Sequence, residues 1–260
     1  MNCNEIMEAL WQLSPAEYAE SWDNVGLLVG KQSTEVKKLM IAVDPTKEVI
    51  NQAIDSGCEM LLTHHPLIFS ALKRVTDEDI VGERVEMLLS NHMCYAAMHT
   101  NFDVMGMADA AADEINLIDR QVLEVTFEDE ISKEGIGRIG KLNQVIKLSE
   151  CAELVKERFK LSSVKVFGDK NQGIETVAIS PGSGKSMVKH AVAGGADVLI
   201  TGDIDHHTGL DAMAEGLCII DAGHYGIEKL FVPYMKDYLS RKLPEVEVMV
   251  AKEQSPFWNI

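Results

Sequence analysis

The chain has 260 residues, 46% of them hydrophobic, and a formal net charge of −17. This length accommodates one large core or two closely packed lobes, and the acidic balance argues against nonspecific binding to the negative backbone of nucleic acid. The apolar runs are short and interrupted, and the acidic, amphipathic start MNCNEIMEALWQL lacks the basic residues of a signal peptide. We therefore expect a cytoplasmic protein with neither a membrane nor nucleic acid as a partner.

The cysteines indicate a reducing environment. They are scattered, odd in number and without a C-x-x-C pair, at Cys3, Cys58, Cys94, Cys151 and Cys218. This pattern is typical of reduced thiols and excludes a cysteine zinc site, so core packing is the expected role for most of them.

The first candidate ligands follow a short apolar run, Met60 to Leu62, which predicts a buried strand. Successive side chains of a strand point to opposite faces, so His64 and His65 diverge and are placed to hold different ions at the strand's C-terminal end. Pro66 pushes His65 toward extended dihedral angles. Open α/β sheets usually carry their sites at this end of the strands.

Two later segments supply carboxylates at the ends of further apolar stretches. In HTNFD, His99 is followed by Asp103, and in GHYGIE, His224 is followed by Glu228. The spacing of four residues places His224 and Glu228 on one face of a helix that we expect over residues 225–239. The two oxygens of Asp103 suit a carboxylate that bridges two ions.

These segments together predict a two-metal site, although each residue also has a plainer interpretation. A lone histidine at a strand end is more often a hydrogen-bonded surface or core residue than a ligand. Three such segments in a chain with eight histidines favour metal binding. The predicted ligands of two divalent ions are His64, His65, Asp103, His224 and Glu228. Five ligands leave coordination positions open, as catalytic sites do, and the mixed set accepts zinc, manganese, iron, cobalt or nickel.

An internal similarity predicts the fold. The segment Ile41–Thr63 aligns with Val177–Thr201, and each reads as strand, helix, strand, followed by a helix and a strand that carries a cysteine, Cys94 or Cys218. We therefore expect an α/β protein of two related lobes, with the metal site in the cleft between them. True duplication and chance similarity of two βαβ units both explain the alignment.

The expected organisation is an N-terminal lobe over residues 1–124, a connecting segment over 125–161 and a C-terminal lobe over 162–260. A glycine-rich loop, SPGSGKS, lies in the last of these. It is no phosphate-binding P-loop, because that pattern requires glycine where Ile179 stands. The loop Gly182–Lys185 is either a tight βα turn or a cradle of backbone amides for an anion.

The residues also resemble a known family. The recurring blocks of the YbgI-like proteins, also called GTP cyclohydrolase I type 2 homologues, are matched in order by SWDNVGLLVG, LLTHHPLIF, HTNFD, GIGRIG, TGDIDHH and GHYGIE. The resemblance implies a dinuclear centre at the same five ligands, with Asp103 in the bridging place. It also implies a hexameric ring with metal sites facing an inner cavity; the domain that some members insert in mid-chain is absent here.

Several polar residues have roles that the sequence leaves open. His99, His206 and His207 are candidates for partners of the ligands, substrate contacts or proton carriers, since imidazole titrates near neutrality. Asp23 and Arg138 lie in blocks that match the family. At the C-terminus, SPFWNI places aromatic side chains that either fold back or form a subunit contact.

Two functions remain after these arguments. The first is a hydrolase in which a metal-activated water attacks a nucleotide-like or phosphorylated small molecule and His99 or a neighbour moves the proton. The family name implies opening of the GTP ring, but a shared fold and metal site serve many reactions. The second is a metal-binding scaffold or protein-interaction ring without turnover.

Overall fold

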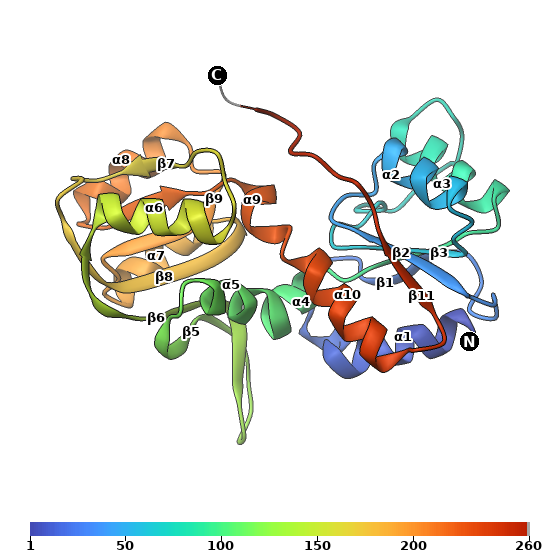
Figure 1. Ribbon diagram of the computed structural model, residues 1–260, viewed down its shortest axis with the longest axis horizontal. Coiled ribbons are helices and arrows are strands. Elements are labelled where there is room, and N and C mark those ends of the chain that lie inside the picture. Colours follow the sequence, from blue (N-terminus) through green and yellow to red (C-terminus); the bar gives the residue numbers. More distant parts are fainter. Residues whose placement is uncertain (259–260) are drawn as a thin grey trace. The chain divides into compact units, whose positions relative to one another are not determined.

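The computed structural model describes residues 1–258 and contains two compact units (Figure 1). The first unit comprises Met1–Phe102 and Phe231–Gln254, and the second comprises Asp103–Leu230 with the C-terminal segment from Ser255. Each unit has its own sheet and core, so each is described by itself.

The first unit contains a five-stranded sheet. In sheet order its strands are β1 (Gly26–Val29), β4 (Cys94–Ala97), β3 (Met60–Thr63), β2 (Lys38–Ala42) and β11 (Glu247–Val250). All pairs are parallel except that of the edge strand β1 with β4. The helices are α1 (Cys3–Leu13), η1 (Ala16–Tyr18), α2 (Lys47–Asp55), α3 (Ile80–Ser90), α4 (Thr100–Phe102) and α10 (Phe231–Lys242).

Helices bury both faces of this sheet, which explains why its strands read as continuous apolar runs. Met40 and Leu61 pack in one cluster with Ile50 of α2 and Leu88 of α3. Leu62 points to the opposite face and is also fully buried. This packing fixes the sheet, and it therefore also fixes the points at which the loops after β2, β3 and β4 begin.

The second unit contains a six-stranded sheet. In sheet order its strands are β5 (Ile118–Glu128), β6 (Lys133–Lys147), β8 (Gly173–Ser183), β9 (Val198–Gly202), β10 (Cys218–Asp221) and β7 (Lys165–Phe167). The strands β8, β9 and β10 are parallel, and the other pairs are antiparallel. Its helices are η2 (Asp103–Met107), α5 (Ala108–Glu114), α6 (Leu148–Arg158), η3 (Lys185–Met187), α7 (Val188–Ala193), α8 (His206–Ala214) and α9 (His224–Glu228).

Two helix pairs cover the two faces of this second sheet (Figure 1). Val155 of α6 and Ile227 of α9 pack with Ile200 on one face. Ala191 of α7 packs with Leu199 on the other. The position of α9 beyond the end of β10 is thus set by core packing.

The two series β2–α2–β3–α3–β4 and β8–α7–β9–α8–β10 have the same order and direction. In the first, Thr63 pairs with both Ala42 and Ala97. In the second, Thr201 pairs with Asp221. The expected α/β fold with two similar lobes is confirmed.

The division of the chain differs from the expected boundaries at 124/125 and 161/162. Residues 125–161 are no connector, because they hold the end of β5 together with β6 and α6, which build the second unit. The first unit is discontinuous: α10 and β11 return to it, and Val250 of β11 pairs with Ile41 of β2. Such long-range pairing leaves no local trace in the sequence.

The helix expected over 225–239 is interrupted. α9 ends at Glu228, α10 begins at Phe231, and the two helices belong to different units. Pro233 has no N–H to donate to the carbonyl of Lys229, so the hydrogen-bond ladder cannot continue across this point. The single predicted helix was therefore wrong, whereas its first turn was placed correctly.

Two expectations from composition can be compared with the structure. All five cysteines are buried and have free thiols, as predicted. Within residues 1–258, every helix is too short or too polar to cross a bilayer.

Candidate metal centre

His64 is the most deeply placed of the predicted ligands, with no exposed surface. It directly follows β3, and its Nδ1 lies 2.8 Å from the carbonyl oxygen of Met98. Because a carbonyl oxygen only accepts, Nδ1 carries the proton and donates it. A histidine whose single ring proton is on Nδ1 has its lone pair on Nε2, which is the state that a metal ion requires.

Carboxylates hold the rings of His65 and His99 in the same way. The Nδ1 of His65 lies 2.8 Å from Asp44 Oδ1, and that of His99 lies 2.9 Å from Asp23 Oδ1. Burial alone would raise the pKa of Asp23, but hydrogen bonds from His99 and Thr100 outweigh it and lower this pKa to about 2. A permanently ionised partner orients the imidazole and raises the basicity of its other nitrogen.

The three histidines gather at one place in the first unit. One ring nitrogen of each lies within 4.8 Å of those of the other two. The ring centroids of His64 and His65 are 5.0 Å apart, and those of His64 and His99 are 5.2 Å apart. Imidazole nitrogens at this spacing suit a divalent transition metal. His99, for which proton transfer is one of three candidate roles, thus lies beside the predicted ligands.

The loop that carries His65 is fixed from two directions. The buried hydroxyl of Tyr95 donates to the carbonyl oxygen of His65 at 2.9 Å and accepts from the N–H of Leu67 at 2.8 Å. The carboxylate of Glu253 accepts from two successive backbone N–H groups, the second being that of Asp44, at 2.8 and 3.0 Å. Both sets of hydrogen bonds hold Asp44 and His65 in register.

His224 and Glu228 lie one turn apart on α9 of the second unit, as their spacing predicted. The Nε2 of His224 is 2.9 Å from Oε2 of Glu228, and its Nδ1 is 2.8 Å from Oδ2 of Asp203. Only 2% of Glu228 is exposed. The Nε2 of His224 and the buried Oε2 of Glu228 thus lie close enough together to contact one cation.

Gly182 in β8 provides the space that the Glu228 carboxylate fills. It has a φ of +75°, and a Cβ built on it would lie 2.6 Å from Oε1 of Glu228 and 3.9 Å from Nε2 of His224. Any larger residue would both strain the backbone and displace the carboxylate. The loop that begins at Gly182 therefore contributes to the site by its lack of a side chain.

The rest of this loop is a tight turn. A Cβ on Gly184 would lie 2.0 Å from Oγ1 of Thr201, and the ammonium of Lys185 is 3.0 Å from Asp205. The side chain of Lys185 is thus already neutralised by a carboxylate, which favours the turn over the anion cradle.

Asp103 begins a π-helical segment, Asp103–Met107, between α4 and α5. Such wide turns interrupt α-helices frequently at functional sites. The buried guanidinium of Arg138 fixes this segment: it contacts Asp109 at 2.8 and 3.0 Å and the carbonyl oxygen of Val104 at 3.3 Å. Arg138, whose role the sequence left open, supports the helix that presents Asp103.

Two further histidines lie outside the centre. His206 and His207 open α8, and both are exposed. Within residues 1–258, no group of ligand atoms close enough to hold an ion includes either of them.

Sequence reasoning missed Asp44 and Asp203, and it named the loop that begins at Gly182 without foreseeing its contact with Glu228. A usable signal existed for the two carboxylates. Ala42 of β2 pairs with Thr63 of β3, so Asp44 and His65 each stand two residues beyond paired positions. By the alignment of Thr63 with Thr201, Asp203 takes the place in the second lobe that His65 has in the first. For the contact of Gly182 with Glu228 the sequence held no signal.

The fold and these residues define an α/β protein with groups of histidines and carboxylates that can bind metal ions. The family model described as Duf34/NIF3 (NGG1p interacting factor 3) matches residues 1–256. The chain belongs to this family, and the expected resemblance to its YbgI-like members is confirmed.

Known relatives cover nearly the whole chain. A protein of Clostridium acetobutylicum named GTP cyclohydrolase 1 type 2 homolog is 31% identical over 250 residues, which are 95% of this chain and 93% of that protein. A Bacillus cereus protein related to NIF3 has the same fold, with a TM-score of 0.94, 23% identity and coverage of 100% and 99% of the two chains. The structure of protein ybgI gives a TM-score of 0.80 at 20% identity, with coverage of 99% and 100%.

Proposed function

We propose that this protein holds two divalent ions and acts as a metal-dependent hydrolase on a nucleotide-like or phosphorylated small molecule. The proposed ligands are His64, His65, Asp103, His224 and Glu228. The supporting observation is an arrangement that His64, His65, His99 and His224 share. In each of them the Nδ1 atom lies 2.8 to 2.9 Å from an oxygen atom, which belongs to a carboxylate in three of the four cases. This arrangement typically orients metal-binding imidazoles. The native metal is zinc, manganese, iron, cobalt or nickel.

The side chains have separate roles in this proposal. Divalent ions at these ligands would lower the pKa of a water molecule and polarise the bond that it attacks. Asp103 takes the bridging place that the family resemblance assigns to it. His99 is the proton carrier: Asp23, ionised because its pKa is about 2, accepts from Nδ1 and stabilises the imidazolium that forms when the other nitrogen takes a proton.

The substrate class is supported by charge and by the relatives. With a net charge of −17, the surface as a whole repels anions, whereas two cations reverse the field locally. The Clostridium acetobutylicum relative is named after a GTP cyclohydrolase. A shared fold and metal site serve many reactions. The name therefore indicates which class of substrate to test, but it does not indicate which bond is broken.

The test is a hydrolysis assay with a matched pair of variants. Metal-loaded protein is assayed on GTP, other nucleoside phosphates and phosphodiesters, and metal content is measured on the same samples. His65→Ala should lose metal and turnover together, whereas His207→Ala, an exposed histidine, should retain both. Full metal occupancy without hydrolysis of any compound would contradict the enzymatic role.

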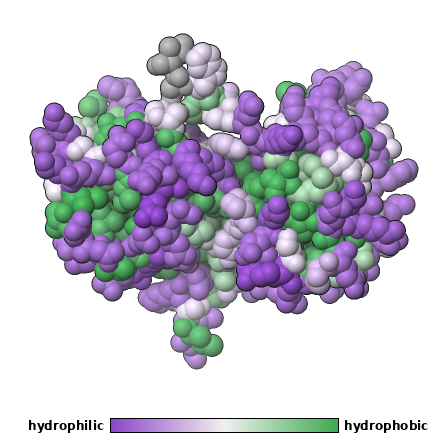
Figure 2. All heavy atoms as spheres, in the orientation of Figure 1, coloured by the Kyte–Doolittle hydropathy of each residue, from purple (hydrophilic) through white to green (hydrophobic). Residues whose placement is uncertain are grey.

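The second candidate is a metal-binding scaffold, a homohexameric ring without turnover. The β5–β6 hairpin supports it, because its tip carries an apolar patch (Figure 2), with Ile131 94% exposed. A monomer gains nothing from such exposure, whereas a subunit contact would bury it. Light scattering decides the assembly: a mass near the 28.7 kDa of one chain would exclude a ring. In either function we expect a cytoplasmic protein.

The C-terminal aromatics are exposed, although one of them lies near the loop before α9. Phe257 lies in the second unit near Gly223, whose built Cβ would be 3.9 Å from the ring. Phe257 and Trp258 nevertheless remain 59% and 79% exposed, so this end of the tail offers aromatic surface that a subunit contact would bury. Ile260, which the same expectation included, lies outside the described residues.

A further inference from the structure

A hollow of about 310 Å³ lies in the second unit, where the loop after α6, the loop before α9 and the C-terminal tail meet. The residues that give it its chemistry are Lys160, Tyr225, Lys229, Phe257 and Trp258. The volume is at the lower end of the range of about 300–1,000 Å³ for small-molecule sites. The hollow is also lined by Gly223, so it adjoins the residue that precedes His224.

Two lysines of this hollow are available to an anion. Lys229 donates to the backbone carbonyl oxygen of Lys160 at 3.4 Å, which keeps both residues at one end of α9. Within residues 1–258, no carboxylate lies at ion-pair distance from either ammonium. Two cations in one hollow without an acidic partner favour a negatively charged ligand.

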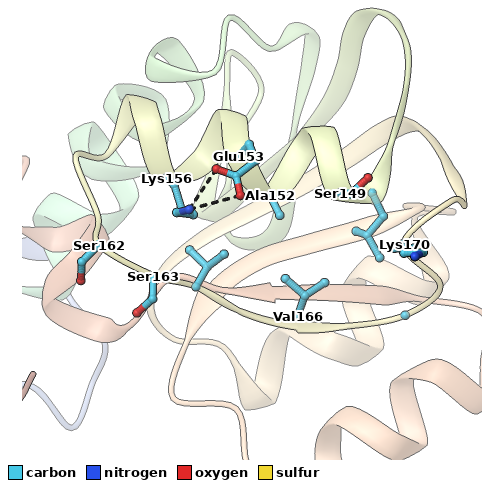
Figure 3. Close-up of a pocket in the computed structure, with 11 residues that line it drawn as sticks. Ser149, Ala152, Glu153, Lys156, Ser162, Ser163, Val166 and Lys170 are labelled. Atoms are coloured by element: carbon cyan, nitrogen blue, oxygen red, sulfur yellow. Dashed lines mark hydrogen bonds and ion pairs between the residues drawn. The ribbon is translucent and has the colours of Figure 1, made fainter. Parts of the chain in front are cut away.

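Lysines in two neighbouring hollows differ from this pair, because they contact carboxylates. Figure 3 shows the one under α6, of about 360 Å³, in which Lys156 is held 2.9 Å from a carboxylate oxygen of Glu153. In another, Lys165 lies 2.9 Å from Asp221. Lys156 and Lys165 are neutralised by these carboxylates, so within residues 1–258 the hollow under α6 keeps one lysine without a carboxylate at ion-pair distance, Lys170, whereas the hollow at the end of α9 keeps two.

The tail supplies the second feature of the hollow. Phe257 and Trp258 are 59% and 79% exposed, although they line it. Their ring faces are therefore accessible, and the faces of aromatic rings bind other flat rings by stacking. The combination of exposed aromatic faces with two lysines defines a ligand with two parts.

We propose that this hollow binds a heteroaromatic ring joined to a phosphate, which is the chemistry of a nucleoside phosphate. The ring stacks on Phe257 or Trp258, and the phosphate is held by Lys160 and Lys229. As a substrate site, this inference rests on the proposed hydrolase, because it places the substrate beside Gly223, the residue that precedes His224. As a binding site, it is independent of turnover.

Binding is measured on full-length protein that has been freed of metal, with GMP, guanosine and inorganic phosphate as probes. Calorimetry gives the affinities, and quenching of tryptophan fluorescence reports stacking; Trp258→Phe identifies which of the three tryptophans responds. GMP should bind, and guanosine or phosphate alone should bind at least about tenfold more weakly, because each makes half of the contacts. Phosphate binding at the same affinity as GMP would overturn the proposal.

A matched pair of lysine variants locates the site. Lys160→Gln should weaken GMP binding about tenfold, the loss expected for one charge-assisted hydrogen bond. Lys170→Gln removes the same charge from the neighbouring hollow under α6 and should leave the affinity unchanged. Trp258→Ala, at an exposed tail position, should weaken binding without affecting folding. Equal affinities in Lys160→Gln and the unaltered protein, or equal losses in both lysine variants, would overturn the site.

The outcome is separable from that of the hydrolase assay. If GMP binds as described but metal-loaded protein hydrolyses nothing, the binding site stands and the proposed reaction falls. If nucleotides are hydrolysed and Lys160→Gln leaves KM unchanged, the reaction stands and this site is refuted.

Discussion

Gly182 and Glu228 are in direct contact across β8 and α9, so that a Cβ on the glycine would stand 2.6 Å from the glutamate Oε1. A residue without a side chain therefore decides where a buried carboxylate points. Because Glu228 in turn contacts His224 at 2.9 Å, the contact positions both predicted ligands of α9.

Gly182→Ala should reduce metal affinity by roughly 10- to 100-fold, the usual effect of disturbing residues that orient metal ligands. The matched control is Gly195→Ala. Gly195 has a φ of +71°, close to that of Gly182, but nothing lies within 4 Å of its built Cβ. Both variants should lose about 1 kcal/mol of stability from backbone strain, whereas only Gly182→Ala should lose metal in a competition titration with a chelator. Equal metal affinities in the two variants would contradict the contact.

The Asp23–His99 pair predicts a pH dependence of stability. The pKa of Asp23 is lowered from 3.8 to about 2 in the fold, so ionised Asp23 stabilises the protein above pH 4, and this stability is lost as the pH falls from about 4 to 2. Asp23→Asn should cost about 2 kcal/mol at pH 7 in urea unfolding of metal-free protein. The difference should shrink as the pH is lowered to 3.

Asp211→Asn, an exposed change of the same type on α8, provides the baseline. It should alter the unfolding free energy little at either pH. A cost for Asp23→Asn that stays constant between pH 7 and pH 3 would mean that the carboxylate charge does not stabilise the fold.

Metal removal should lower the melting temperature. A ligand that binds only the folded state stabilises it by RT ln(1 + [L]/Kd), roughly 2.7 kcal/mol when free metal exceeds Kd about a hundredfold. Glu228→Gln, which keeps the size of the side chain but removes its charge, should melt at nearly the same temperature with and without a chelator. An unchanged melt of the unaltered protein after verified metal removal would show that the ions contribute little to stability.

Arg138→Lys should destabilise the second unit by about 2 kcal/mol or more, since the guanidinium is 6% exposed and contacts both oxygens of Asp109. A lysine cannot form that bidentate pair. Arg241→Lys, which alters an exposed pair with Asp237, should change stability by less than about 0.5 kcal/mol. Similar urea midpoints for the two variants would count against a supporting role of Arg138 near Asp103.

Local spacing was enough to predict parts of the site. His224 and Glu228 are four residues apart, and a single helical turn brings them together whatever the rest of the chain does. His64 and His65 follow the strand Met60–Thr63, whose first three residues are apolar and which is buried at every position, as expected of a strand covered on both faces. In both cases neighbours in the sequence determine the geometry.

The supporting carboxylates show where sequence reasoning ends. Asp23 and His99 are 76 residues apart, and they meet only because the loop before β1 lies beside the end of β4. Glu253 is 209 residues from Asp44 and reaches it because the chain re-enters the first unit through α10 and β11. Sequence spacing carries no information on such contacts, since they depend on the pairing of strands far apart in the chain.

The sequence by itself thus determined the α/β class, the strand–helix–strand order of the two similar segments and which side chains stand at strand ends, because these follow from the periods of helix and strand. The tertiary structure alone decided the extent of the two units, the break before Pro233, the proton position on His64 and the space that Gly182 leaves for Glu228. Those features arise from packing and hydrogen bonds between distant segments, whose free energy is gained only when the whole fold forms.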